Sequence, residues 1–140
     1  MIKNIFNPGS YPININLALL ILRLTVGGFM LSHGLGKFSK LVGDEVIQFA
    51  DPFGIGVTAS LALVVFAEMF CSVFLILGIA TRLSAIPLII TMLVAAFIAH
   101  ADDGFGKQEL PLLYMLCYIV LLISGPGKIA LDSVIYSKLK

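Results

Sequence analysis

Apolar residues run through most of this chain in four long stretches, which are separated by short polar segments. The stretches cover residues 13–35, 57–79, 83–99 and 110–124. A helix needs about 20 residues to cross the hydrocarbon core of a bilayer, and the first two stretches have that length. The other two reach it with their polar ends, as spans 83–100 and 108–125. The period-two alternation of membrane-spanning strands is missing, so the pattern predicts an all-α integral membrane protein.

The segments between the spans predict how the helices are connected. Only residues 80–82 separate the second span from the third, so these two are expected to form a tight antiparallel hairpin. Residues 36–56 form the longest connection, and their apolar side chains suit a short segment lying across one end of the bundle. Gly125, Pro126 and Gly127 end the last span. We therefore expect one transmembrane domain over residues 1–140, a four-helix bundle with antiparallel helices, short loops and a longer first loop.

Composition supports this class and excludes several others. Hydrophobic residues make up 59% of the 140 residues and charged residues only 12%, about half the charged fraction of a soluble protein. The net charge of +1 leaves no basic surface for nucleic acid. No P-loop, dinucleotide fingerprint, nucleophile elbow or CxxC is present, which argues against a self-sufficient enzyme. Cys71 and Cys117 fall inside spans and are interpreted as packing residues.

Basic residues predict the orientation of the bundle. Four spans place both termini on the same side of the membrane. That side carries Lys3, Arg82, Lys128, Lys138 and Lys140, and the opposite side carries Lys37, Lys40 and Lys107. The excess of basic residues favours cytoplasmic termini in a multi-pass protein of the inner (plasma) membrane.

Two charged residues of opposite sign lie within the first two spans. A charge at mid-membrane depth costs a few kcal/mol or more, so such residues usually face a partner or a cavity. Arg23 lies about 12–15 Å along its helix from the side of the termini, and Glu68 lies roughly 16 Å from the same side. We therefore predict an Arg23–Glu68 ion pair. The pair is either a structural contact that fixes helix register or one wall of a pocket for an anion, a proton or a quinone-like head group.

A second group of polar residues lies near the opposite ends of the spans. His33 and Lys37 are four residues apart and share a helix face, while His100 and Glu109 flank the loop between the third and fourth spans. Tyr114 is placed to form hydrogen bonds inside the bundle. The spacing matches no metal signature, so we expect no metal. Imidazole suits proton exchange near neutral pH; the alternative is that both histidines are interfacial polar caps.

The order of these motifs resembles that of the DoxX family. Residues 23–37, RLTVGGFMLSHGLGK, contain the Arg, Gly-Phe, His-Gly and Lys of that family's first helix. Further matches are Glu68, Gly78, Thr81, Arg82, His100, Glu109, Tyr114, Gly125, Pro126, Gly127 and Asp132. The resemblance implies a four-helix membrane protein. It also implies kinship with the small DoxD-type subunit of thiosulfate:quinone oxidoreductase and with DoxX proteins of membrane oxidoreductase complexes.

The resemblance also implies a function and a set of site residues. The polar-pocket candidates are Arg23, His33, Lys37, Glu68, His100, Glu109 and Tyr114. We expect a membrane subunit of a quinone-dependent oxidoreductase that carries no cofactor of its own beyond a bound quinone. Its expected partners are membrane lipids and an oxidoreductase partner chain, with a homo-oligomer left open. Two alternatives also stay open: a transporter or permeation subunit for a small molecule or proton, and a membrane scaffold for assembly or stress protection.

Overall fold

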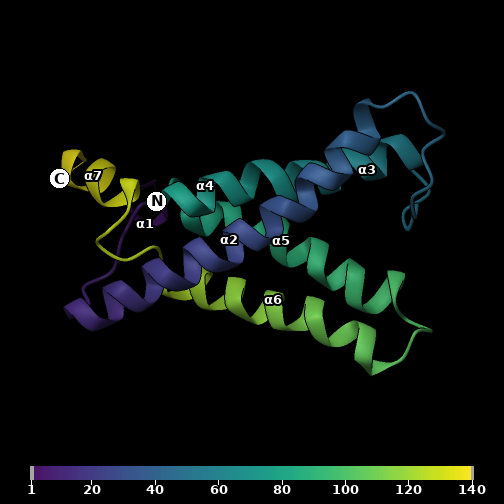
Figure 1. The fold of residues 1–140 in the computed structure, drawn as a ribbon. Helices are drawn as coiled ribbons and strands as arrows, with labels where there is room; N and C mark the ends of the chain where they lie inside the picture. The colour runs from purple at the N-terminus through teal and green to yellow at the C-terminus, as the bar shows by residue number, and fades with distance from the viewer. Residues whose placement is uncertain (1, 140) are drawn as a thin grey trace.

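The computed structural model describes residues 2–139, with side chains from residue 4 onward, and the regular structure in this range is helical (Figure 1). Four helical segments of the described range are long and apolar enough to cross a membrane: Ile13–Val42, Val57–Leu77, Thr81–Ala99 and Phe105–Ser124. The predicted all-α class with four membrane-length helices is confirmed. The Lys3 and Lys140 side chains, used above for orientation, lie outside the described residues.

The elements follow one another in a simple order. They are α1 (Ile2–Ile5), α2 (Ile13–Val42), α3 (Val57–Val65), η1 (Phe66–Cys71), α4 (Ser72–Leu77), α5 (Thr81–Val94), η2 (Ala95–Ala99), α6 (Phe105–Ser124) and α7 (Leu131–Lys138). The second membrane-length helix therefore consists of α3, η1 and α4, and the third of α5 and η2. Both η segments are π-helical turns, which occur frequently at functional sites.

The long helices run antiparallel, so the two termini lie at the same end of the bundle (Figure 1). The loop between α2 and α3 and the loop between η2 and α6 both lie at the opposite end. α2 packs along α3, η1 and α4, and α5 packs most extensively against α6. α2 and α6 touch each other much less, which leaves a groove between them.

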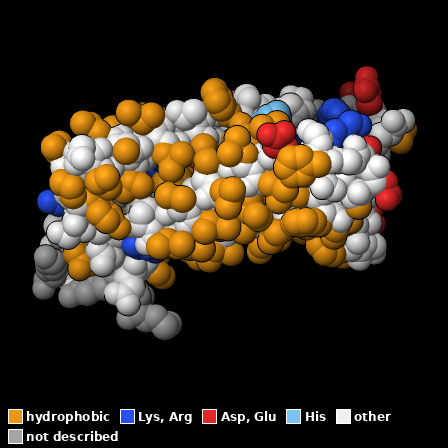
Figure 2. Space-filling view, turned by 90° about the horizontal axis from the view of Figure 1, so that it is seen from below, with side chains coloured by type: hydrophobic (Ala, Val, Ile, Leu, Met, Phe, Trp, Pro, Cys, Tyr) orange, Lys and Arg blue, Asp and Glu red, His pale blue; other side chains and the backbone are white. Residues whose placement is uncertain are grey.

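The outer surface of the bundle is apolar. Each long helix exposes large hydrophobic side chains, for example Ile21, Leu63, Ile90 and Ile123. Hydrophobic side chains cover most of the face in Figure 2, and most of its charged side chains lie toward the two ends. Exposing such an apolar surface is unfavourable in water but not in the hydrocarbon of a membrane. The distribution matches a protein whose middle section lies in lipid.

The end of α4 shows why the hairpin between the second and third spans is so tight. Gly78 ends the helix in the left-handed region, at φ 69°, where glycine carries no steric penalty. A Cβ on Gly78 would lie 2.6 Å from the Ala130 Cβ and 2.9 Å from an Arg23 nitrogen. The absence of a side chain therefore lets the segment before α7 pack directly against this turn.

Candidate functional site

A cavity of about 810 Å³ lies between α3–η1 on one side and α5–η2 on the other. Residues 49–53 of the first loop also line it, so this loop lies over the cavity as the sequence predicted for an apolar segment across the bundle end. Most lining side chains are apolar. The polar residues of its lining are Lys37, Asp51, Ser60, Glu68, Thr91 and His100.

An ion pair forms the polar part of the inner wall. The Lys37 Nζ lies 2.5 Å from the Glu68 Oε1. The Glu68 side chain is 3% exposed, whereas the Lys37 side chain is 31% exposed. The Lys37 ammonium also lies 6.0 Å from the centre of the Phe49 ring, within range of a cation–π contact. Lys37 is thus the accessible member of the pair, and Glu68 fixes its position and balances its charge.

Local backbone structure brings these two residues together. Glu68 sits in η1, on the side of the second helix that faces α2. Gly34 of α2 lies directly against it: an added Cβ would meet the Glu68 carbonyl carbon at 2.6 Å and the Met69 nitrogen at 2.7 Å. Small residues allow this kind of close helix approach in membranes. The approach lets Lys37, one turn further along α2, reach the Glu68 carboxylate.

Asp51 fastens the first loop to the start of α3. Its carboxylate accepts hydrogen bonds from the Ser60 hydroxyl at 2.7 Å, the Gly56 N–H at 2.8 Å and the Ile55 N–H at 3.1 Å. These bonds favour the ionised form and hold the pKa of Asp51 below its usual value, with the Ser60 hydroxyl as the main cause. The loop that lies over the cavity is therefore held in a defined place.

A short chain of charged groups lies at the loop end of the cavity. The His100 Nδ1, at the end of η2, lies 2.7 Å from the Asp103 Oδ2. The Lys107 Nζ lies 3.4 Å from the other Asp103 oxygen. The hydrogen bond from His100, with the help of Lys107, lowers the pKa of Asp103. His100 thus connects the cavity lining to exposed polar groups at the membrane surface.

The predicted Arg23–Glu68 ion pair is wrong. Arg23 is buried and donates instead to three backbone carbonyls: Pro126 at 2.8 Å, Ile129 at 2.9 Å and Ile76 at 3.4 Å. Two of these acceptors belong to the segment between α6 and α7, which folds back over the end of the bundle. The guanidinium satisfies these carbonyls and does not approach the Glu68 carboxylate.

A buried carboxylate completes this contact at the end near the termini. Asp132 is fully buried, and its oxygens accept hydrogen bonds from the Ala80 and Thr81 N–H groups at 2.6 and 2.9 Å. The Asp132 N–H donates in turn to the Gly78 carbonyl at 2.8 Å. Together with Arg23, Asp132 anchors the C-terminal segment to the turn before α5. These residues hold the fold together and lie apart from the cavity.

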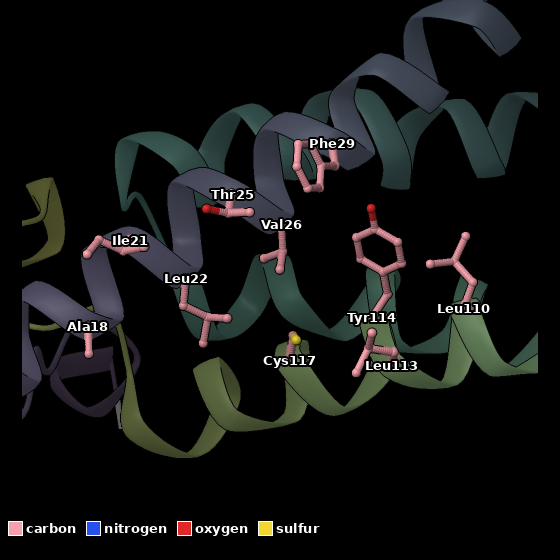
Figure 3. Close-up of a pocket in the computed structure, with 10 residues that line it drawn as sticks. All are labelled: Ala18, Ile21, Leu22, Thr25, Val26, Phe29, Leu110, Leu113, Tyr114 and Cys117. Atoms are coloured by element: carbon pink, nitrogen blue, oxygen red, sulfur yellow. The ribbon is translucent and has the colours of Figure 1, made fainter.

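The remaining candidate residues lie elsewhere. His33 and Glu109 are exposed and are not part of either cavity lining. Tyr114 lines a second hollow of about 640 Å³, the apolar groove between α2 and α6, where its ring projects from α6 toward α2 (Figure 3). The structure therefore brings together Lys37, Glu68 and His100, and it separates the other four candidates from them.

Sequence reasoning missed several residues of the cavity. Phe49, Asp51, Ser60 and Thr91 line it but stand in no recognisable motif. The one local signal is Asp51, which precedes the Gly54–Gly56 turn and accepts bonds from the turn's own backbone. Thr91 has no such signal. Its hydroxyl donates to the Pro87 carbonyl of its own helix, and this bond does not distinguish a cavity residue in the sequence.

Four membrane-length helices, with a cavity between the second and the third, define a multi-pass membrane protein. The chain belongs to the DoxX family, whose model matches residues 18–101. An uncharacterized protein of Haemophilus influenzae is 33% identical over 125 residues, which cover 84% of this chain and 83% of the relative. A second uncharacterized protein of that organism is 31% identical, with 86% and 92% covered. The uncharacterized membrane protein Rv3486 of Mycobacterium tuberculosis is 30% identical, with 82% and 79% covered. No solved structure matches the chain.

Proposed function

We propose that this DoxX-family protein binds a quinone-class redox carrier in the cavity between α3–η1 and α5–η2 and serves as the membrane subunit of an oxidoreductase. The observation that carries the proposal is the Lys37–Glu68 pair in the wall of an otherwise mainly apolar cavity. Such a site suits a ligand with a small polar head and an apolar tail. The cavity volume of about 810 Å³ is within the usual range for small-molecule sites.

The charge balance of the pair favours an uncharged head group. An ammonium group has three N–H donors, and Glu68 takes one of those of Lys37. A quinone carbonyl oxygen is a neutral acceptor that suits one of the others. A free anion would gain less binding energy from Lys37, because the adjacent Glu68 carboxylate already neutralises the lysine. The pair thus supports a quinone over an anionic substrate.

A quinone reaction also needs room for the isoprenoid tail and a route for protons, and other parts of the cavity suit both. Its apolar walls include Leu63, Phe66, Ile90 and Ile98, each on the lipid-facing surface of its helix, which suits an isoprenoid tail entering from the membrane. His100 leads from the cavity to Asp103 at the surface and provides a place for proton exchange. Electrons would come from a partner chain.

Native mass spectrometry of the protein extracted in lipid nanodiscs tests the proposal. We expect a bound mass equal to that of the host quinone, lost in Lys37→Gln and retained in Lys40→Gln. Lys40 is the control because it is an exposed lysine of the same helix, three residues away. Absence of quinone from the wild-type protein, together with failure to bind added quinone, would contradict the proposal.

A second assay separates the proposal from transport. Substrate-dependent proton or anion flux into liposomes, abolished by Glu68→Gln, would support a transporter in place of an oxidoreductase subunit. Substitutions in the cavity that change neither quinone binding nor flux would leave a scaffold role. The three roles can be separated because only the oxidoreductase subunit requires quinone in the cavity.

We also propose that the protein lies in a bacterial inner membrane with cytoplasmic termini. The end with the termini carries Arg82, Lys128 and Lys138, a distribution that the positive-inside rule favours on the cytoplasmic side. The curated relatives described above are bacterial. A C-terminal reporter fusion should be active only as a cytoplasmic reporter; activity of a periplasmic reporter at the same position would contradict this orientation.

A further inference from the structure

Of the five buried side-chain polar atoms that lack a hydrogen-bond partner within the described part of the chain, three belong to the second membrane-length helix and to α6. They are the Glu68 Oε2, the Ser72 Oγ and the Tyr118 hydroxyl. Their residues are almost completely buried, at 2%, 0% and 0% exposed. Buried polar groups are nearly always paired, so each of these atoms requires an explanation.

The three residues come from neighbouring parts of the fold. Ser72, the first residue of α4, follows Glu68 of the π-helical η1 by four residues, so the two project from roughly the same side of the second helix. Tyr118, on α6, interacts electrostatically with Glu68. It belongs to the same core cluster as Cys71 and Leu75, which flank Ser72 along the chain. All three residues therefore belong to the buried core of the bundle next to the Lys37–Glu68 pair.

The donor and acceptor types in this region are complementary to water. The carboxylate oxygen accepts only, while the two hydroxyl groups both donate and accept. A buried water molecule typically makes about three hydrogen bonds to groups that would otherwise be unpaired. A water can therefore donate to Glu68 and satisfy both hydroxyl groups.

We propose that Glu68, Ser72 and Tyr118 form an internal water-binding site behind the cavity. The site gives Glu68 two different neighbours, with Lys37 bound to Oε1 and a water bound to Oε2. It also extends the hydrogen-bonded network from the cavity wall to Tyr118, which stacks on Tyr114 at a ring-centre distance of 6.2 Å. Tyr114 lines the α2–α6 groove, so the polar residues cross the bundle from one hollow to the other. This proposal does not depend on the identity of the cavity ligand.

Infrared difference spectra recorded in H₂¹⁶O and H₂¹⁸O test for the water directly. We expect an O–H stretching band of an internal water that shifts with the oxygen isotope in the wild-type protein and disappears in Tyr118→Phe. Tyr114→Phe is the matched control and should keep the band, because Tyr114 faces the groove. A wild-type spectrum with no isotope-sensitive internal water band would overturn the proposal, as would a band unchanged in Tyr118→Phe.

Stability provides a second measurement with opposite expected signs. If a water joins the three groups, Tyr118→Phe leaves Glu68 and Ser72 without part of their hydrogen bonding and lowers the folding equilibrium constant on the order of tenfold. If the hydroxyl is unpaired, its removal is neutral or stabilising, and this result would contradict the site. The measurement is unfolding in bicelles, with Tyr114→Phe as the control. Quinone binding can fail while both measurements succeed, so the two proposals are tested separately.

Discussion

Glu68 is nearly buried at membrane depth, and its charge is tolerated because Lys37 lies against it. Removing one partner of a buried ion pair leaves an uncompensated charge, which costs about 3–5 kcal/mol in reported cases. Replacing both partners by apolar residues of similar size is often neutral or stabilising. The two residues are therefore expected to behave as a unit in folding, whatever the cavity binds.

A double-mutant cycle measures this coupling. Lys37→Met should destabilise the protein by about 3 kcal/mol because Glu68 loses its ion-pair partner among the described residues. Glu68→Leu should cost less, because the lysine is partly exposed and its amine can reach water. The double variant should recover most of the loss, as measured by unfolding in bicelles. Purely additive effects of the two substitutions would show that the residues are not coupled.

At the residue scale, the sequence identified the intramembrane charges but paired Arg23 with the wrong acceptor. Depth along a helix can be counted from the sequence, whereas the direction in which a side chain points depends on helix rotation. Arg23 faces carbonyls of the C-terminal segment, more than 100 positions away along the chain. Lys37 was expected at the bundle mouth, but α2 is longer than the apolar stretch and ends at Val42. The lysine therefore extends from a membrane helix to a buried carboxylate.

At the scale of elements, the close contact between α2 and η1 determines the geometry of the site. Gly34 supplies this contact, since an added Cβ would lie within 2.8 Å of three backbone atoms of Glu68 and Met69. Backbone atoms cannot move aside as a flexible side chain can. The two helices would have to separate, and Lys37 would no longer reach Glu68 in the same geometry.

Gly34→Ala is therefore expected to destabilise the protein by about 1–3 kcal/mol, the usual effect of overpacking. Gly36→Ala is the matched control, because a Cβ at Gly36 meets nothing within 4 Å. Alanine also has the higher helix propensity, so this control should be neutral or stabilising by up to about 1 kcal/mol. Unfolding in bicelles checks both variants. Equal effects of the two substitutions would contradict the close contact.

The helices themselves were largely predictable and their irregularities were not. Long apolar stretches define membrane helices because lipid requires every backbone group to bond within its own segment. The π-helical turns η1 and η2 have no comparable sequence signal. Residues of both turns line the cavity.

At the scale of the whole molecule, the first loop closes one end of the bundle over the cavity. Its place depends on Asp51, whose pKa is lowered by hydrogen bonds to Ser60, Gly56 and Ile55. A depressed carboxyl pKa contributes stability that is present above the ordinary Asp value and is lost as the pH falls through the lowered pKa. The loop should thus stay fixed at neutral pH and loosen in acid.

Asp51→Asn tests this contribution at neutral pH. Hydrogen exchange of the Ile55 and Gly56 amides should become faster in the variant, because a neutral amide is a weaker acceptor than a carboxylate. In the wild-type protein the protection factors of the same amides, which correct for the intrinsic exchange rate, should fall only at acidic pH. Asp44→Asn, an exposed residue near the start of the loop, should leave both amides unchanged. Exchange rates in Asp51→Asn equal to those of the wild-type protein would contradict this role.

The fold class could be predicted from the sequence, but the cavity could not. Four spans with short loops require antiparallel helices with both termini at one end, as Figure 1 shows. The cavity depends on which faces of α3, η1, α5 and η2 meet, and apolar residues around the whole circumference give no such face preference. His100 and Glu68 were identified because polar residues are rare in this chain, whereas Thr91 and Ser60 were not.

The most direct test of the account is an equilibrium titration with a short-tailed quinone of the protein in nanodiscs. The account predicts saturable binding to the wild-type protein, about tenfold or more weaker in Lys37→Gln because a charged hydrogen-bond donor is lost. Lys40→Gln should bind as tightly as the wild-type protein. Binding that is absent, or equally tight in all three proteins, would contradict a quinone site at Lys37 and Glu68.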